Sequence, residues 1–207
     1  MHPKNFFYKN RSIVKSKTSR IEKNVILAPR NNTRIVIGEH SSINGPNTHI
    51  LSYFNDIIIG NYCSIAMGVK IIEYNHRHSS LSTSRILKLM ENDLKSDYKS
   101  KGSIIIGSDV WIGMDCHILS GVKIGDGAVI SSNSTVTKDI PAFSIVGGSP
   151  ARVLKMRYSE DIIEILQKIQ WWNYGLDELI PYQNIFRKDK LSLEDVKLLQ
   201  LDLRNNL

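Results

Sequence analysis

The sequence predicts a mainly β protein, built as a parallel β-helix with a protruding loop and C-terminal α-helices. Three observations support this prediction: apolar residues recur every six positions, one long polar segment breaks the rhythm, and helical spacing replaces it after Pro150. With 207 residues the chain is long enough for one domain with its own core and a small appendage.

β-Branched residues lead successive hexads through the middle of the chain. A helix would instead place apolar residues at i, i+3 and i+4, and an amphipathic strand would alternate them. A period of six is typical of short strands joined by tight turns, and each coil of such a solenoid buries its apolar face against its neighbours. The spacing therefore predicts a parallel β-helix and leaves its hand open. The leading residues are Ile59, Ile65 and Ile71, then Ile106, Ile112, Ile118, Ile124, Ile130 and Val136, with a weaker start at Ile37.

A long polar segment interrupts the hexads after Ile71. Ile71 and Ile106 are 35 positions apart, which is not a multiple of six. The segment 77–103 carries no repeat, contains a short stretch of helical character at Ile86–Leu94, and follows directly after His76. Because long excursions from a rigid solenoid are usually functional or disordered, this segment marks the candidate site.

Helical spacing replaces the hexads toward the C-terminus. Ser159 stands at an N-cap position, and two acidic residues follow it in the first turn. A second helix is expected to start near Ser192. Trp171 and Trp172 lie between the two helices, where we expect them to form an apolar plug against the solenoid.

The chain divides into three parts by composition and pattern. They are a basic N-terminal arm (1–34), a β-helix domain (35–152) with its loop insertion (77–103), and a C-terminal helical segment (153–207). The arm holds nine Lys and Arg against one acid, so it carries the surplus behind the net charge of +7. Such an arm is either a solvated face or a surface that attracts an anionic partner.

The composition excludes several classes of protein. No apolar run approaches the roughly 18–20 residues needed to cross a bilayer, and no apolar stretch follows the basic N-terminus as a secretion signal would require. Cys63 and Cys116 are too few for a disulfide framework and lack metal-ligand spacing. The glycine fingerprints of nucleotide-hydrolysing and dinucleotide-binding proteins are missing. We expect a cytoplasmic protein with no membrane span.

The segment Ile106–Arg152 is similar to hexapeptide-repeat acyltransferases. With Asn75-His76-Arg77 before the excursion and Trp171-Trp172 after a short helix, the chain most resembles the xenobiotic, CatB-like O-acetyltransferases. That group includes enzymes acting on chloramphenicol, streptogramins, sialic acid and capsular polysaccharide. The resemblance covers about residues 35–185. It implies a left-handed β-helix with about 18 residues per coil, and a homotrimer with active sites between subunits. The early hexads (35–58) and the basic arm depart from the family pattern.

The resemblance implies transfer of an acetyl group from acetyl-CoA to a hydroxyl, with His76 as general base. This reaction needs a base for the hydroxyl proton, donors for the developing oxyanion, and a slot that holds both substrates. Imidazole suits the role of base because it titrates near neutral pH. We expect His76 to take the proton as the acceptor oxygen attacks the thioester, and to pass it to the CoA sulfur. Asn75, Arg77 and His78 are the expected substrate-binding residues.

The resemblance also implies a slot for acetyl-CoA that runs along the coils and ends near residues 147–152. Trp111 is expected at the acetyl or pantetheine end, and cationic side chains are needed against the phosphates. For each Ser and Thr, an ordinary role in a turn fits nearly as well. The expected donor-binding residues are Trp111, Ser131, Ser132, Thr137, Lys138, Arg152, Lys155 and Arg157.

The acceptor stays open between two classes. The basic arm favours a sugar or an anionic polysaccharide, and an antibiotic such as a streptogramin or chloramphenicol is the alternative. Cysteine catalysis is disfavoured because Cys63 and Cys116 both occupy the fifth, corner-packing place of their hexads. We therefore expect direct transfer without a covalent intermediate.

Two other functions fit the pattern less well. A zinc hydratase on this fold needs three imidazoles at one metal, and His76, His78 and His117 lack such spacing, so no metal is expected. A non-enzymatic scaffold or a nucleic-acid binder would use the arm, where the aromatic run 6–8 stands beside lysines. Docking of the arm on its own trimer explains these aromatics better, and no nucleic acid is expected as a partner.

Overall fold

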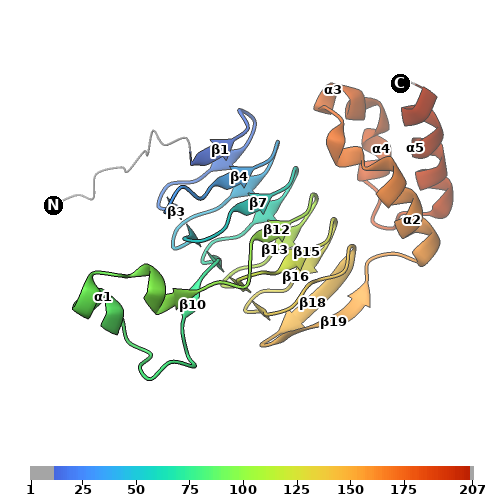
Figure 1. Ribbon diagram of the computed structural model, residues 1–207. Coiled ribbons are helices and arrows are strands. Elements are labelled where there is room, and N and C mark those ends of the chain that lie inside the picture. The colour runs from blue at the N-terminus through green and yellow to red at the C-terminus, as the bar shows by residue number, and fades with distance from the viewer. Residues whose placement is uncertain (1–11, 206–207) are drawn as a thin grey trace.

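The chain folds as a stack of short parallel strands, with an excursion at one corner and a group of helices at another (Figure 1). The structure is a computed structural model, and it describes residues 12–205. Each coil contributes one strand in turn to each of three sheets, and the strands within a sheet pair in parallel until the last pair. The mainly β, parallel architecture predicted from the hexads is confirmed.

The three sheets are named here by the order in which the chain visits them. The first sheet contains β1 (Ile13–Lys15), β4 (Ile35–Ile37), β7 (Ile57–Ile59), β12 (Ile104–Ile106) and β15 (Lys123–Ile124). The second contains β2 (Arg20–Ile21), β5 (Ser42–Ile43), β8 (Ser64–Ile65), β13 (Trp111–Ile112), β16 (Val129–Ile130), β18 (Ser144–Gly148) and the antiparallel β19 (Ala151–Met156). The third contains β3 (Ile26–Pro29), β6 (His49–Ser52), β9 (Lys70–Ile72), β14 (His117–Leu119) and β17 (Thr135–Val136).

A column of β-branched side chains fills the interior of the coils. The leading residues of the hexads all point inward, and Ile65, Ile112 and Ile118 are 0% exposed. Each side chain packs against the equivalent residue of the next coil, as in the register Ile65–Ile112–Ile130 of the second sheet. Burial of one such side chain stabilises the fold by about 1.5–3 kcal/mol. The column therefore holds the coils in register without any need for long strands.

The coils differ in length between the two ends of the stack. Ile35 pairs with Ile57, 22 residues later, whereas Ile106 pairs with Ile124, 18 residues later. The extra residues of the early coils lie in their turns, which is why the hexads look irregular there. Strands β1, β2 and β3 already pair with the following coil, so the stack includes Ile13 and extends to the N-terminal side of residue 35. The part of the predicted arm at 1–11 lies outside the described residues.

The turns between strands depend on left-handed backbone conformations. Asp109, Asp115 and Asn133 have φ values of 55°, 55° and 59°, a region that Asp and Asn tolerate better than most residues. Gly127 has φ 67°, and a Cβ at this position would clash with the ring of Phe143. The Asp, Asn and Gly that follow the leading residues are thus required by the turn geometry.

The excursion leaves the stack at the corner between the third and the first sheet. The chain leaves β9, forms β10 (Asn75–His76), α1 (Ile86–Glu91), η1 (Lys95–Asp97) and β11 (Tyr98–Lys99), and re-enters at β12. Figure 1 shows it projecting away from the coils as a separate green lobe. The helix predicted over Ile86–Leu94 is present but shorter, because Asn92 takes the left-handed conformation and ends it.

Helices follow the last strand and cover the corner between the first and second sheets. Ser159 occupies the predicted N-cap position of the first of them, but its hydroxyl bonds the Asp161 carboxylate and makes no bond to the helix backbone. The expected second helix starts directly after Ser192, whose hydroxyl accepts from the Asp195 N–H. The elements are α2 (Glu160–Ile169), η2 (Trp171–Asn173), α3 (Leu176–Leu179), η3 (Ile180–Tyr182), α4 (Gln183–Phe186) and α5 (Leu193–Asn205). No helix within residues 12–205 is long and apolar enough to span a bilayer.

The tryptophan pair attaches the helices to the coils. Trp172 is 4% exposed and packs with Phe143, Leu166 and Val196 in a second apolar core. Its carbonyl accepts a hydrogen bond from Asn61 Nδ2 at 3.1 Å, in the turn that follows β7. The predicted plug is therefore present, seated against a corner of the coils.

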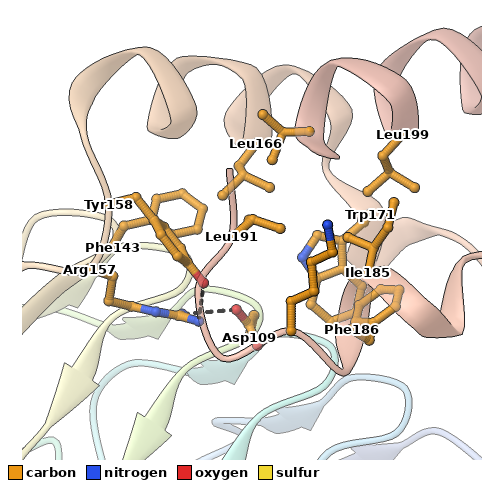
Figure 2. Close-up of a pocket in the computed structure, with 12 residues that line it drawn as sticks. Asp109, Phe143, Arg157, Tyr158, Leu166, Trp171, Ile185, Phe186, Leu191 and Leu199 are labelled. Carbon is orange, nitrogen blue, oxygen red and sulfur yellow. Dashed lines mark hydrogen bonds and ion pairs between the residues drawn. The ribbon is translucent and has the colours of Figure 1, made fainter. Parts of the chain in front are cut away.

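An ion pair joins the end of β19 to the same corner. Arg157 Nη1 donates to Asp109 Oδ2 at 3.0 Å and to the Gly127 carbonyl at 2.6 Å, and Nη2 donates to the Tyr158 hydroxyl at 3.0 Å. Figure 2 shows this group on one side of a cavity of about 320 Å³, opposite Phe186. Burial raises the pKa of Asp109, and the guanidinium of Arg157 opposes that rise.

Replacement of Arg157 by alanine tests how far the helices depend on this pair. Arg157→Ala leaves the partly buried Asp109 carboxylate without its partner, so we expect the free energy of unfolding at pH 7.5 to fall by about 1–3 kcal/mol. The pKa of Asp109 then rises further, and the unfolded chain releases this proton first. Stability should therefore decline as the pH rises above about 4 and through the raised pKa. Urea unfolding at pH 4.5 and 7.5 measures both effects.

The matched control is Arg187→Ala, which removes an exposed arginine directly after α4 that bonds only Gln183 among the described side chains. A change within about 0.5 kcal/mol is expected for it. Equal losses of unfolding free energy in the two variants would contradict the role assigned to Arg157. So would a loss in Arg157→Ala that is the same at pH 4.5 and 7.5.

Candidate active site on the excursion

His76 lies where the excursion leaves the coils, on a short antiparallel ribbon. Strand β10 pairs with β11, with Asn75 opposite Lys99 and His76 opposite Tyr98. The side chain of His76 is exposed. Its ring meets the edge of the Tyr98 ring at a centroid distance of 4.9 Å and an interplanar angle of 85°. The imidazole thus stands on an aromatic side chain and faces outward.

A backbone carbonyl sets the tautomer of His76. Nδ1 lies 2.9 Å from the Thr83 carbonyl oxygen, which can only accept a hydrogen bond. The proton therefore resides on Nδ1, and Nε2 carries the lone pair. This is the arrangement that a general base requires, because the ring is held by one nitrogen while the other remains basic.

The residues around His76 bring positive charge to the ribbon. Arg77 Nη1 donates to the Ser96 carbonyl at 3.0 Å, and the Arg77 N–H donates to the Asp97 carbonyl at 3.2 Å. Lys99 Nζ donates to His78 Nε2 at 2.8 Å. The predicted substrate-binding residues Asn75, Arg77 and His78 are therefore near His76, although Arg77 also helps to close the excursion on itself.

Three residues that the sequence pattern does not mark also shape this site. Tyr98 supports the imidazole, as described above. Asp97 is 5% exposed, and its carboxylate accepts hydrogen bonds from the N–H groups of Leu87 and Lys88 at 3.0 and 2.8 Å. Asp97 therefore caps the N-terminus of α1, although it lies after that helix in the sequence. Glu73 is 0% exposed and lies at the base of the excursion. A carboxylate in the third place of an apolar hexad (IIEYNH) is the one signal that could have drawn attention to it.

An aromatic cluster fills the space between the coils and the ribbon. The ring centroid of Tyr53 lies 5.5 Å from that of Tyr74 and 5.8 Å from that of Tyr98, and Tyr74 and Tyr98 are 5.1 Å apart. Burial raises the pKa of Tyr74. A mostly apolar cavity of about 310 Å³ is lined by residues of α1 and of the segment before it, among them Leu81 and Met90. Both of these side chains are largely exposed.

The predicted donor-binding residues fall on two faces of the chain. Trp111, 55% exposed, lies on the outer face of the second sheet, and Arg152 and Lys155 lie on β19 at the end of that sheet. Ser131 and Ser132 follow in the turn after β16, where Ser132 Oγ accepts the Met114 N–H at 3.1 Å. Thr137 and Lys138 come after β17, at the corner from which the excursion departs. One chain therefore does not bring all of these residues to His76.

Arg157 is placed differently from the prediction. Its guanidinium donates hydrogen bonds to Asp109, to the Gly127 carbonyl and to Tyr158, and these contacts join the end of β19 to the coils. A phosphate group would have to displace these contacts. We therefore leave Arg157 out of the donor site, while Arg152 and Lys155 are exposed on β19.

The two thiols are buried in the coils. Burial raises the pKa of Cys63 to about 12, and it also raises the pKa of Cys116. Since the thiolate is the nucleophilic form, neither cysteine suits covalent catalysis near neutral pH. Within residues 12–205, no cluster of three or more His, Cys, Asp or Glu side chains has an arrangement that could hold a metal ion.

Known proteins share both the repeat and the fold. The family model "Bacterial transferase hexapeptide (six repeats)" matches residues 103–138. The "Probable macrolide acetyltransferase" of Lysinibacillus sphaericus is 39% identical over 154 residues, which are 68% of this chain and 83% of that protein. A "Chloramphenicol acetyltransferase" of Morganella morganii is 42% identical over 130 residues, or 59% of this chain and 62% of that enzyme, so the chain spans less than two thirds of its length.

A solved structure agrees on the fold alone. A point mutant of AntD, an N-acyltransferase from Bacillus cereus, superposes with a TM-score of 0.54 at 20% identity, covering 76% of this chain and 89% of that one. The hexad-led coils and the long alignment with the Lysinibacillus relative together establish the family. The chain belongs to the bacterial hexapeptide-repeat transferases.

Proposed function

We propose that this chain is an acetyl-CoA-dependent O-acetyltransferase in which His76 is the general base. The observation that carries the proposal is the contact of His76 Nδ1 with the Thr83 carbonyl, because it leaves Nε2 as the basic nitrogen of an exposed imidazole. The similarity to a chloramphenicol acetyltransferase and to a probable macrolide acetyltransferase supports the reaction class.

In the proposed reaction, Nε2 accepts the proton of the acceptor hydroxyl as its oxygen attacks the thioester carbonyl of acetyl-CoA. The tetrahedral intermediate collapses with cleavage of the C–S bond, and the imidazolium returns the proton to the CoA sulfur. The Thr83 carbonyl stabilises the imidazolium while it exists, because it accepts from Nδ1–H. Transfer is direct, which agrees with the raised pKa values of Cys63 and Cys116.

The active site of this proposal lies between subunits of a homotrimer. Trp111, Ser131, Arg152 and Lys155 lie on the second sheet or at the corner that follows it, whereas His76 lies at the corner between the third and first sheets. A donor slot that uses both sets needs one face from each of two chains. The left-handed sense of the coil and the cofactor slot itself are part of the same proposal. Thr137 and Lys138 then stand on the His76 side of the slot, with Ser132 opposite.

The outer face of the first sheet supports self-association. Its outward side chains form an aliphatic ladder of Val14, Val36, Ile58 and Ile105, in register from β1 to β12. Ile58 and Ile105 are each 37% exposed, and Val14 is 47% exposed. A continuous row of branched apolar residues is characteristic of a surface that packs against another chain. The excursion leaves at the edge of this sheet, so a neighbour seated on it would lie beside His76.

The acceptor we propose is a hydroxyl of an anionic sugar or polysaccharide. Arg77 and Lys99 lie next to His76 on the ribbon and supply positive charge for such a substrate. A second candidate, an antibiotic hydroxyl, is favoured by the names of the relatives from Morganella morganii and Lysinibacillus sphaericus. The two candidates share His76 and differ only in the group that meets the ribbon.

The trimer is tested by mutation of the aliphatic ladder. We expect the parent protein to sediment at about three times the chain mass of 23.5 kDa. Ile105→Glu places a charge in the ladder and should yield monomers or dimers, because an unpaired carboxylate is costly to bury. Leu176→Glu, at an exposed position of α3, should leave the mass unchanged. A monomeric parent would contradict the proposal.

The general base is tested by replacement of His76. His76→Ala should lower kcat by about 10²–10⁴-fold, the range typical of a lost acid–base group. The melting temperature should hardly change, since the side chain is exposed. His40→Ala is the control, because His40 stacks on Tyr62 at 4.8 Å at the corner beside the C-terminal helices. Parental kcat in the His76 variant would place the base elsewhere.

The acceptor is tested with a panel and a salt series. Acetyl transfer to sialic acid oligomers, oligogalacturonate, maltose, chloramphenicol, a streptogramin and a macrolide is measured with acetyl-CoA. We expect the anionic oligosaccharides to react best, with a KM that rises with ionic strength because salt screens the attraction. Lys99→Gln should raise that KM and leave the KM for maltose unchanged. Activity on the antibiotics alone would favour the second candidate.

A further inference from the structure

A buried carboxylate connects the coils to both ends of the excursion. Glu73 is fully buried, and its carboxylate accepts hydrogen bonds from four donors. Its Oε2 accepts the N–H groups of Tyr53 and Phe54 at 3.0 and 2.9 Å. Its Oε1 accepts Asn55 Nδ2 at 2.8 Å and the hydroxyl of Ser100. Glu73 directly follows β9 and Ser100 directly follows β11, so one side chain ties the entry of the excursion to its exit.

The exit end is in turn docked on the next coil. The Ser100 hydroxyl lies 3.1 Å from the Ser120 hydroxyl, and Ser120 Oγ accepts the Lys101 N–H at 2.7 Å. The Gly121 N–H donates to the Gly102 carbonyl at 3.1 Å. Glu73 is therefore the first member of a polar network that spans three coils at the base of the excursion.

Two short routes lead from Glu73 to His76. Along the chain the two residues are three positions apart. Through space, the turn that donates to Glu73 carries Tyr53, whose ring centroid lies 5.8 Å from that of Tyr98, and Tyr98 lies 4.9 Å from the imidazole. Tyr98 is itself two positions before Ser100. Tyr98, which contacts the imidazole, is thus connected to the carboxylate of Glu73 through Tyr53 on one side and Ser100 on the other.

The ribbon that bears His76 cannot fix its own orientation. Strands β10 and β11 have two residues each, and an isolated two-stranded ribbon is marginally stable at best in water. The orientation of the ribbon therefore depends on the base of the excursion and on its contacts with the coils, while the Thr83 carbonyl holds the ring of His76.

We propose that Glu73 is a positioning residue for acetyl transfer: it fixes both ends of the excursion and the aromatic seat beneath His76, and so aims Nε2 at the acceptor hydroxyl. The proposal rests on the function proposed above, with His76 as base. Glu73 does not touch a substrate. Its effect should appear in kcat, because a small misplacement of a catalytic group slows the chemical step while leaving distant binding contacts intact.

Glu73→Gln is the principal test. Glutamine keeps the shape of the side chain but replaces one acceptor oxygen by an NH₂ donor, so one pair of donors loses its acceptor. With acetyl-CoA and the acceptor of the panel that the parent acetylates fastest, we expect kcat to fall about tenfold to a hundredfold. The KM for acetyl-CoA should stay within about twofold of the parent value if the donor contacts are untouched. Ser100→Ala, which removes one of the four donors, should lower kcat less and covers the case in which the glutamine variant does not fold.

Hydrogen exchange and a matched control separate positioning from general destabilisation. Exchange measured by mass spectrometry should become faster in Glu73→Gln over residues 52–56 and 97–101, and stay unchanged over 125–135, which lie outside the network. Asp126→Asn is the control, since Asp126 Oδ1 also accepts a backbone N–H, that of Ser108 at 2.6 Å, at a corner away from the excursion. That variant should lose comparable stability and keep the parental kcat.

The outcomes are distinguishable from those for the proposed function. Full activity of His76→Ala would overturn the function and this inference together. Where His76→Ala is inactive, parental kcat in both Glu73→Gln and Ser100→Ala would overturn only the role of Glu73. An equal fall of kcat in Asp126→Asn would also overturn it, because the loss would then reflect stability alone.

Discussion

The stacking of coils on a single column of branched aliphatic residues is the constraint on which everything else depends. No strand in the first or third sheet exceeds four residues, so hydrogen bonds along any one strand are too few to hold it. Each coil is stable because its inward residues, such as Ile65, Ile112 and Ile118, are buried against the coils on either side. The corners and outer faces are consequently free to carry other chemistry, and the proposed base His76 and donor-binding residue Trp111 lie there.

Different corners of the coils carry different attached segments. One corner receives the C-terminal helices through Trp172 and the Arg157–Asp109 pair, and another releases the excursion that carries His76. The second sheet presents Trp111 on a separate face. The proposed site between subunits would bring these separate faces together.

Sequence alone predicts the parts of the structure that repeat. The leading residues at Ile59–Ile71 and Ile106–Val136 mark the inward column, and the break after Ile71 marks the excursion with His76 at its start. The inclusion of Ile13 in the stack escapes prediction because long turns obscure the period of the early coils. Arg157 looks like one more cation near the others, and only the fold reveals its pairing with Asp109. Glu73, Asp97 and Tyr98 act through contacts across the chain that leave no local pattern.

The change from 22 to 18 residues per coil has an evolutionary meaning. Ile35, Ile57 and Ile104 stay in register although Ile57 follows Ile35 by 22 positions and Ile104 follows Ile57 by 47. Insertions at a corner therefore leave the neighbouring layers undisturbed. Such an architecture accepts new surface segments one at a time, and descendants of one ancestor can acquire different substrates by lengthening a corner while the inherited interior is kept.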